Sequence, residues 1–338
     1  MFTSIILNKF TAFNKLKLDF SPGINILIGE NGTGKTHILK ALYASADIST
    51  TKRSLAEKIK RVFLPYNEQI GRLVTRNGGK GSGYIEIYRE SGNNDLMIRL
   101  SIKQSDKKPE SAKISGYTRQ WTTFPVESVF IPVKEMLANA VGFRSLYDSR
   151  KIAFEEVYAD IITKALMPIP RDKTESDRNK IIESLRKAIN GSVINKNEEF
   201  YLKNKQGDLE FTLLAEGFRK LGLLLILIQN DTLPNGSVLF WDEPETNLNP
   251  KLIRTVIKIL IELQRMGVQI FLTTHNYVIL KEFDLQIKPD DNIMYHSLYR
   301  NKETEEIESF STEYYDQIEP NKILDTFSDL YDRELTRF

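Results

Sequence analysis

Apolar and polar residues follow different periods along the start of the chain. Two short alternating runs, Ser4–Leu7 and Leu16–Phe20, precede the continuous apolar run Ile24–Ile28. Alternation is typical of strands with one buried face, and a continuous apolar run is typical of a strand buried on both faces. Apolar residues then recur at helical spacing to about Ala46. This region therefore predicts an N-terminal sheet followed by a helix.

The next part of the chain mixes helical, strand and loop signals. Residues 50–75 have a helical and basic pattern, and the glycine-rich segment Gly78–Gly83 then breaks the chain. Glycine clusters interrupt regular elements, so we expect separate strands after it, near Tyr84–Arg89 and Leu96–Ile102. The polar, lysine-rich stretch Gln104–Gln120 predicts a mobile loop.

The second half of the chain predicts a helical insertion between strands. Val129–Ile131 predicts a strand, and the pattern from Lys134 to about Asn190 is mostly helical, with an interruption at Pro168–Pro170. The apolar runs Val238–Trp241 and Val268–Leu272 predict two buried strands. We therefore divide the chain into residues 1–133, the N-terminal half of a core; 134–212, an inserted α-helical lobe; 213–300, the C-terminal half of the core; and 301–338, an acidic helical tail.

A glycine-rich loop, Gly29–Thr36, joins the third predicted strand to the following helix. In a phosphate-binding loop of this pattern, backbone N–H groups point at the phosphates, the lysine reaches the β- and γ-phosphates, and the threonine hydroxyl binds Mg²⁺. An ordinary glycine turn would not need the strand-to-helix context. We therefore expect a nucleotide bound by Gly29, Asn31, Gly32, Thr33, Gly34, Lys35 and Thr36, with Thr36 also a metal ligand.

Two acidic residues, Asp242 and Glu243, follow the buried run Val238–Trp241. Ligands of α/β sheets bind at the carboxyl ends of the strands, so these carboxylates would face the phosphates. We expect Asp242 to hold Mg²⁺ and Glu243 to orient or deprotonate the attacking water. The alternative, two exposed turn acids before Pro244, does not explain the four apolar residues that precede them.

His275 follows the other buried run, Val268–Leu272, after Thr273 and Thr274. A histidine at such a strand end can donate a hydrogen bond to a γ-phosphate oxygen. Taken alone, it would more often be an ordinary turn residue, but the order of the motifs favours the functional interpretation. His37 and His296 have no such context, and we expect both to be structural.

Together, the order of these motifs resembles that of the ABC-type ATPases, in the branch that contains the SMC, RecF and OLD-like proteins. The resemblance covers nearly the whole chain and rests on the phosphate loop, the segment Leu214–Lys220, the sequence DEPETNLNP at residues 242–250, and the TTH ending at His275. The segment Ala215–Lys220 and the sequence at residues 242–250 look closest to the compact OLD-like or Septu-like ATPases of bacterial anti-phage systems. The resemblance implies an α/β ATPase head with a mixed β-sheet core, an N-terminal antiparallel subdomain and an inserted α-helical lobe.

The resemblance also implies ATP and Mg²⁺ as cofactors and a homodimer, or a higher oligomer, that encloses two nucleotides. Glu216, Gly217, Arg219 and Lys220 would contact the nucleotide held by the opposite subunit, and residues 246–250 would line the dimer seam. Most relatives have a signature serine where this chain has Ala215, so the contact would depend on backbone amides and on Arg219 or Lys220. Lys134-Glu135 lies near the place where the family has its lobe-linking loop.

Composition narrows the classes of protein to be considered. The 338 residues are 41% hydrophobic, contain no cysteine and carry a net charge of +2. Disulfides, thiolate metal sites and cysteine nucleophiles are excluded, and we expect a cytoplasmic protein without a membrane segment. Residues 302–338 hold eleven acidic and four basic side chains, whereas 52–61 and 99–119 are basic. Such runs are more often solvated surface than binding sites.

Three functions remain open from the sequence. The first is an ATP-driven switch that regulates a separate effector encoded nearby, in anti-phage defence. The second is a RecF-like DNA-binding repair ATPase, with phosphate contacts from residues 52–61 and 99–119. The third is the nucleotide-binding subunit of a transporter. The acids after His275 are scattered among apolar residues at helical spacing, which favours an amphipathic tail over a nuclease metal cluster.

Overall fold

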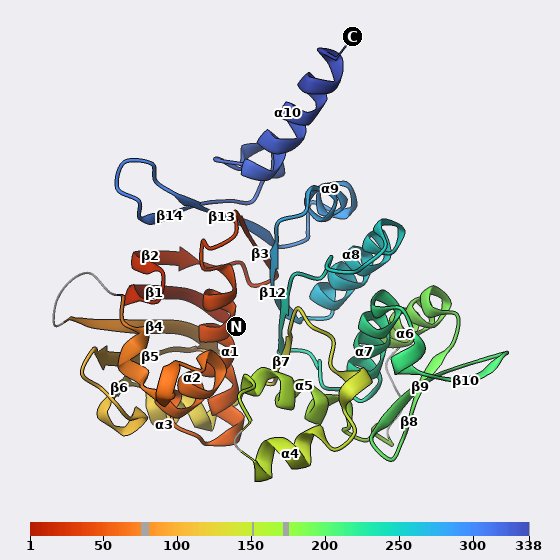
Figure 1. Ribbon diagram of the computed structural model, residues 1–338, viewed down its shortest axis with the longest axis horizontal. Coiled ribbons are helices and arrows are strands. Elements are labelled where there is room, and N and C mark those ends of the chain that lie inside the picture. The colour runs from red at the N-terminus through yellow and green to blue at the C-terminus, as the bar shows by residue number, and fades with distance from the viewer. Residues whose placement is uncertain (76–80, 151, 172–175, 338) are drawn as a thin grey trace.

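The computed structural model describes residues 1–75, 81–150, 152–171 and 176–337 (Figure 1). Its central sheet has six strands in the order β14-β13-β3-β12-β11-β7. The five strands from β13 to β7 are parallel, and β14 pairs antiparallel with β13, so the sheet is mixed. In this order the strands are Ile307–Thr312, Ile293–Arg300, Ile24–Gly29, Gln269–Thr274, Val238–Asp242 and Ser128–Ile131.

A second, antiparallel sheet contains most of the N-terminal strands and forms the left side of Figure 1. Its order is β2-β1-β4-β5-β6, with strands Phe13–Asp19, Phe2–Phe10, Ser82–Ser91, Asn94–Lys103 and Lys113–Gly116. The predicted strands at 84–89 and 96–102 therefore exist and pair with each other. Residues 78–80 of the predicted glycine break, Gly78–Gly83, lie outside the described residues, and β4 begins at Ser82.

Helix α1 (Lys35–Thr51) lies in the core between the two sheets and buries thirteen of its residues. Helix α2 (Leu55–Phe63) packs beside it. Apolar side chains from both sheets meet there, and the Phe240 and Phe271 rings stack with their centroids 5.3 Å apart. Because the helix that follows the glycine loop is part of this core, the loop is anchored to the packed interior of the molecule.

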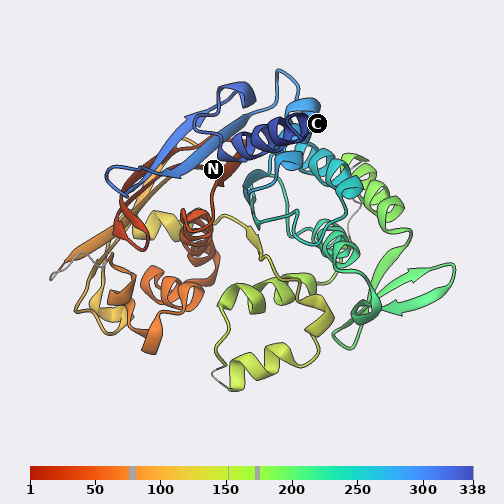
Figure 2. The same cartoon turned by 45° about the horizontal axis from the view of Figure 1, so that its top comes forward.

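The other face of the mixed sheet is covered by helices (Figures 1 and 2). These are α5 (Glu156–Ala165), α6 (Ser176–Ile189), α7 (Glu216–Gln229), α8 (Pro250–Arg265) and α9 (Tyr277–Gln286). α4 (Phe143–Ser149) packs on α5, and the lobe also carries β8 (Ser192–Lys196), β9 (Glu199–Asn204) and β10 (Gly207–Glu210). In both views this small sheet lies at the end of the molecule opposite the antiparallel sheet.

The predicted fold class, an ATPase head with a mixed sheet, an antiparallel subdomain and a helical lobe, is confirmed, but two segments differ from prediction. Residues 104–120 contain β6 and the start of α3 (Thr118–Thr123) instead of a mobile loop. Trp121 of α3 is buried and its indole N–H donates to the Ser45 carbonyl at 2.7 Å. The tail 301–338 is helical only in its second half, α10 (Lys322–Leu335), because β14 precedes it.

Short 3-10 turns complete the chain. They cover Tyr66–Glu68, Ile70–Leu73, Pro109–Ser111, Leu137–Asn139, Phe211–Leu213 and Tyr315–Gln317. Among the described residues, no helix combines the length and the apolar character that crossing a membrane requires.

Candidate nucleotide-binding site

The glycine loop connects β3 to α1 at the carboxyl edge of the mixed sheet. Gly29, Gly32 and Gly34 all have positive φ, at 144°, 81° and 85°. A Cβ at Gly29 would lie 2.1 Å from the Leu298 carbonyl oxygen, and one at Gly34 would lie 2.4 Å from Cζ of Phe13. Only glycine fits these two positions, so the loop conformation is fixed by close backbone approach as well as by φ.

Lys35 folds back over the loop that it follows. Its Nζ donates to the carbonyl oxygens of Gly29 at 2.6 Å and Glu30 at 2.9 Å. Burial lowers the pKa of Lys35, and the neighbouring carboxylates, Glu243 foremost, oppose this shift. An ammonium group has three donors, and one remains for a phosphate oxygen.

Asp242 ends β11 beside the first residues of α1. The Thr36 hydroxyl lies 3.0 Å from both carboxylate oxygens, and the Thr273 hydroxyl donates to Oδ1 at 2.6 Å. Burial raises the pKa of Asp242, and these two hydrogen bonds counteract the shift. Thus a carboxylate and a hydroxyl from segments more than two hundred residues apart meet where the nucleotide motifs predict a cation.

Glu243 and His275 lie next to each other on the open side of Asp242. His275 Nδ1 is 3.3 Å from Glu243 Oε1, and the His275 side chain is 46% exposed. Glu243 has a φ of 48°, and its backbone N–H donates to Thr273 Oγ1 at 3.0 Å. A non-glycine residue held in the left-handed region is often found at a functional site. The geometry therefore fits the general base and γ-phosphate donor that the sequence predicts.

Glu245 supports this pair and was not recognised from the sequence. It is buried and accepts hydrogen bonds from the Thr274 hydroxyl at 2.6 Å and from the His275 backbone N–H at 3.2 Å. Burial raises its pKa, and its Oε2 has no hydrogen-bond partner among the described residues. Its position, three residues after Asp242, was the only available signal, and it becomes informative once β11 and β12 are known to be neighbours.

The start of α7 packs against the loop that follows β11. Glu216 Oε2 accepts from Asn247 Nδ2 at 2.8 Å, and a Cβ at Gly217 would lie 3.1 Å from the Asn247 carbonyl oxygen. Ala215 caps the helix without a side-chain hydrogen bond. The Phe218 N–H donates to the Ala215 carbonyl at 3.0 Å, which leaves the N–H groups of Glu216 and Gly217 as the donors that could bind an anion.

Arg219 and Lys220, also predicted to contact the nucleotide, are both engaged within the chain. Lys220 is 1% exposed, and its Nζ donates to the Thr246 carbonyl at 2.7 Å. Arg219 Nε lies 3.6 Å from Glu135 Oε2, in the segment that enters the helical lobe. Burial raises the pKa of Glu135. Lys220 thus fixes the loop that ends at residue 250, and Arg219 joins the signature helix to the lobe.

A hollow of about 270 Å³ borders the glycine loop. Gly29, Glu30, Asn31 and His275 line one side, and Lys322, Ile323, Thr326 and Phe327 of α10 line the other. The position of the C-terminal tail beside the glycine loop was not predicted from the sequence. No local signal could have indicated it, because the contact depends on the path of β13 and β14.

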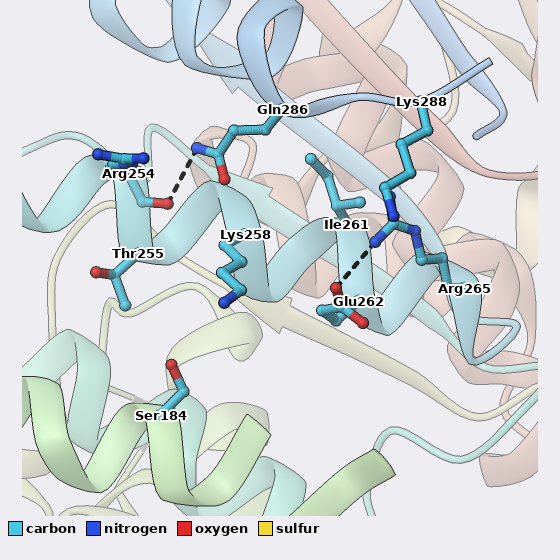
Figure 3. A pocket seen from close by; sticks show the side chains of 9 residues that line it. All are labelled: Ser184, Arg254, Thr255, Lys258, Ile261, Glu262, Arg265, Gln286 and Lys288. Carbon is cyan, nitrogen blue, oxygen red and sulfur yellow. Dashed lines mark hydrogen bonds and ion pairs between the residues drawn. The ribbon is translucent and has the colours of Figure 1, made fainter. Parts of the chain in front are cut away.

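A larger cavity of about 590 Å³ lies away from these residues, between α6 and α8 (Figure 3). Lys258 and Ser184 face each other across it, and Arg254 lies further along α8. Arg254 and Lys258 have no acidic partner within the described part of the chain, whereas Arg265 pairs with Asp291 at 2.8 Å. This groove is basic and does not belong to the nucleotide site.

Of the other two histidines, His296 is fully buried and His37 is half-buried. Burial lowers the pKa of His37 to about 4 and that of His296 to about 3. His296 hydrogen-bonds Ser311 Oγ at 2.8 Å, and His37 lies against the Phe63 ring. Both are therefore neutral structural residues. Within the described ranges, no group of three or more His, Asp or Glu side chains is arranged to hold a metal ion.

A family model described as "AAA domain, putative AbiEii toxin, Type IV TA system" matches residues 24–281, from β3 into α9. This range contains the glycine loop, the signature helix, Asp242, Glu243 and His275. The chain belongs to this family. Membership implies a P-loop ATPase fold and ATP binding.

Curated relatives match a shorter part of the chain. The DNA replication and repair proteins RecF of Latilactobacillus sakei subsp. sakei and of Streptococcus agalactiae serotype V are 31% and 32% identical over 117 residues. Each match covers 34% of this chain and 28% of the relative. The chain thus spans less than a third of the length of these relatives.

Solved structures match nearly the whole chain. An SMC head bound to the C-winged helix domain of ScpA covers 92% of this chain and 97% of its own, with a TM-score of 0.58 and 14% identity. The SMC head domain from Thermotoga maritima gives a TM-score of 0.52 at 14% identity and covers 93% of this chain and 99% of its own. At such identities the likeness shows the fold alone. The narrower resemblance to OLD-like or Septu-like proteins stays a prediction.

Proposed function

We propose that this protein is an ATP-hydrolysing switch that closes into a dimer around two nucleotides and controls a separate effector. The observation that carries the proposal is the meeting of Thr36, Asp242 and Glu243 at the carboxyl edge of the sheet, with His275 beside them. ATPases need this combination because phosphoryl transfer depends on positioning and charge stabilisation.

In this proposal, the residues divide the work between binding and hydrolysis. The N–H groups of Gly32 and Gly34, with Asn31 and Thr33, surround the β-phosphate, and Lys35 uses its free donor on a phosphate oxygen. Glu243 accepts a proton from the attacking water, and His275 donates to the γ-phosphate. Glu245 keeps His275 in place through its backbone N–H. These roles agree with the exposure of His275 on the open side of the site.

The oxygen donors at the edge of β11 fit a magnesium ion. Mg²⁺ is usually bound by one or two protein oxygens together with waters and substrate phosphates. The Thr36 hydroxyl and the Asp242 carboxylate supply such oxygens, and their contact at 3.0 Å shows that both can reach one point. When bound, Mg²⁺ would neutralise charge on the phosphates.

Dimer formation follows from the position of the signature helix. The Glu216 and Gly217 N–H groups at the start of α7 are helix-terminal donors, and in the proposed dimer they complete the site of a second copy. We propose that Glu216 and Gly217 contact the opposite nucleotide, with Arg219 oriented by Glu135. Lys220 acts indirectly, by holding the Thr246 carbonyl.

The effector is the finer part of the proposal. The family name refers to a toxin–antitoxin system, and the motifs resemble those of anti-phage ATPases, so we propose a companion protein encoded nearby and a role in phage defence. An ATP-gated dimer can control a partner only if the partner binds its open and closed states with different affinity.

Co-purification tests the effector. A tagged copy expressed with its neighbouring genes should retain a neighbour's product, with at least a tenfold change in affinity between ATP-bound and nucleotide-free protein. The variant Lys35→Ala should abolish this nucleotide dependence, and Lys107→Ala, an exposed change, should not. If the protein alone protects cells from phage or cleaves nucleic acid, the separate effector is wrong.

A second candidate function, DNA binding, is favoured by the basic groove of Figure 3. The basic segment 52–61 is less suited to it than the sequence suggested, because Arg53, Lys58, Lys60 and Arg61 are all paired with acids. If the groove binds duplex DNA, the logarithm of the binding constant should fall linearly with the logarithm of the salt concentration. The slope should be about 0.9 for each phosphate contact. Replacing Arg254 and Lys258 with Ala should reduce the slope by about 2, whereas Lys205→Ala should leave it unchanged.

A further inference from the structure

The C-terminal helix α10 begins at the edge of the nucleotide site. Asn321 caps it by accepting from the Leu324 N–H at 3.1 Å, and the Ser297 hydroxyl of β13 donates to the Pro320 carbonyl at 2.5 Å. The Phe327 ring packs against Tyr277, with 4.7 Å between centroids. The start of α10 is thus fixed to the mixed sheet and to the residues after His275.

The rest of α10 projects away from the body of the molecule (Figure 1). Ile323 is its only buried residue, and Leu330, Tyr331 and Leu335 are 50%, 61% and 62% exposed. On an ideal helix the apolar side chains of α10 fall within an arc of about 140°. The opposite side is acidic, with Asp325, Asp329 and Asp332. An apolar stripe on a projecting helix is typical of a protein contact.

A second exposed apolar pair flanks the signature turn. Leu213 precedes α7 and is 74% exposed, and Phe218 in its first turn is 38% exposed. Neither residue is needed to contact a phosphate. Both lie within a few residues of Gly217, whose helix we propose to dock on the nucleotide of a second copy.

We infer that the apolar stripe of α10 docks on Leu213 and Phe218 of a second copy when the two chains close around ATP. The inference rests on the proposed ATP sandwich. That arrangement brings the second copy's α7 over the glycine loop and His275, and Phe327 lines the same hollow as these residues. The apolar stripe of α10 and the Leu213–Phe218 pair of the second copy would therefore lie next to each other in the dimer. In a two-fold dimer the contact forms twice, so each tail clamps the opposite chain.

The absence of cysteine allows a direct test by cross-linking. In a Glu243→Gln background, one preparation carries Leu330→Cys and another, with a larger tag, carries Leu213→Cys. A short bismaleimide should link the two different chains with Mg-ATP at least tenfold more than without it. Leu285→Cys on α9, which is 68% exposed, replaces Leu330→Cys as the control and should give no ATP-dependent product.

Charge substitutions test whether the contact contributes to affinity. Leu330→Asp with Leu335→Asp should weaken ATP-dependent dimerisation at least tenfold, and Leu285→Asp should leave it unchanged. If the α10 variant dimerises as well as its parent, the inference is wrong while the sandwich stands. If it dimerises more tightly, α10 blocks the interface and the inference is also wrong. If the parent forms no dimer with ATP, both proposals fall.

Discussion

The two ends of helix α1 lie in different environments. At its first residues, Lys35 and Thr36 join Asp242 and Glu243 in a group of polar side chains that is open on one side and keeps a donor for a ligand. At its second half, Asp47 joins a buried ion-pair network in which the charges of this chain balance one another. The same helix thus carries one charged group that we propose is completed by a nucleotide and another that is completed by the protein.

The network joins α1 and α2 to α5 of the helical lobe. Lys58 Nζ lies 2.9 Å from Asp47 and 2.7 Å from Asp160, and Arg53 pairs with Glu156. Burial alone would lower the pKa of Lys58, but the three carboxylates outweigh it and raise the pKa. In contrast, the pKa of Lys35 is lowered, because its carboxylates are more distant and burial dominates. The difference is consistent with a structural role for Lys58 and with the binding role that we propose for Lys35.

Lys58→Ala should have the largest effect. The variant leaves Asp47, Glu156 and Asp160 buried without their shared cation, and breaking such a group costs about 3–5 kcal/mol of unfolding free energy. Urea unfolding measures the change. Lys17→Ala, which removes an exposed pair with Asp19, should cost less than about 1 kcal/mol. Equal losses in the two variants would show that the network is not a structural centre.

Glu243→Gln should change turnover and leave the fold intact. Loss of a general base slows hydrolysis on the order of a hundredfold, or about 2.7 kcal/mol, while ATP binding is retained because Glu243 acts on water. Steady-state phosphate release and nucleotide titration measure the two quantities. Glu110→Gln, an exposed change, should hydrolyse ATP normally. A Glu243→Gln variant with normal turnover would remove Glu243 from its role.

Lys35→Ala sharpens the contrast between the two lysines. It should weaken ATP binding at least tenfold, about 1.4 kcal/mol, since the free donor for the phosphates is lost. Its unfolding free energy without nucleotide should stay within about 1 kcal/mol of the parent, unlike that of Lys58→Ala, because burial already disfavours the Lys35 charge. Unchanged ATP affinity and turnover would contradict the proposed site.

Lowering the pH should weaken Mg²⁺-dependent ATP binding, and this should be the smallest of the four effects. Because burial raises the pKa of Asp242, this carboxylate takes up a proton at a higher pH than usual and then cannot hold a cation. The ratio of ATP affinities with Mg²⁺ and with EDTA should therefore fall as the pH is lowered, starting above the pH range in which an ordinary aspartate titrates, and by less than about tenfold in all. The variant Asp242→Asn lacks the titrating carboxylate, so its pH dependence measures the contribution of the nucleotide's own titration. The idea fails if the parent and this variant show the same pH dependence.

The sequence predicted those parts of the fold and site that local patterns determine. The strands at 24–28 and 238–241 were found because each is a continuous apolar run, and the glycine loop because its spacing is itself the motif. Asp242 ends β11 and His275 follows the end of β12, the neighbouring parallel strand, so both lie at the same edge of the sheet. Fold class and the edge where the site lies could therefore be predicted.

Contacts between distant segments could not be predicted. Residues 104–120 are polar, yet they are ordered up to Trp121, which is anchored to Ser45 of α1. In the basic segment 52–61, the acidic partners of Arg53 and Lys58 lie about a hundred residues away, in α5, and could not be recognised from the sequence. Lys220 seemed suited to a phosphate until its contact with Thr246 was known. In each case a partner far along the chain decides the role of the residue.

The most direct test of the central claim is the mass of Glu243→Gln in solution at micromolar concentration, measured by light scattering. With Mg-ATP the account predicts a particle of twice the chain mass, and without nucleotide a single chain. The double variant Lys35→Ala, Glu243→Gln should remain a single chain in both conditions. A Glu243→Gln protein that binds Mg-ATP and still has the mass of one chain would contradict the proposed ATP-dependent dimer.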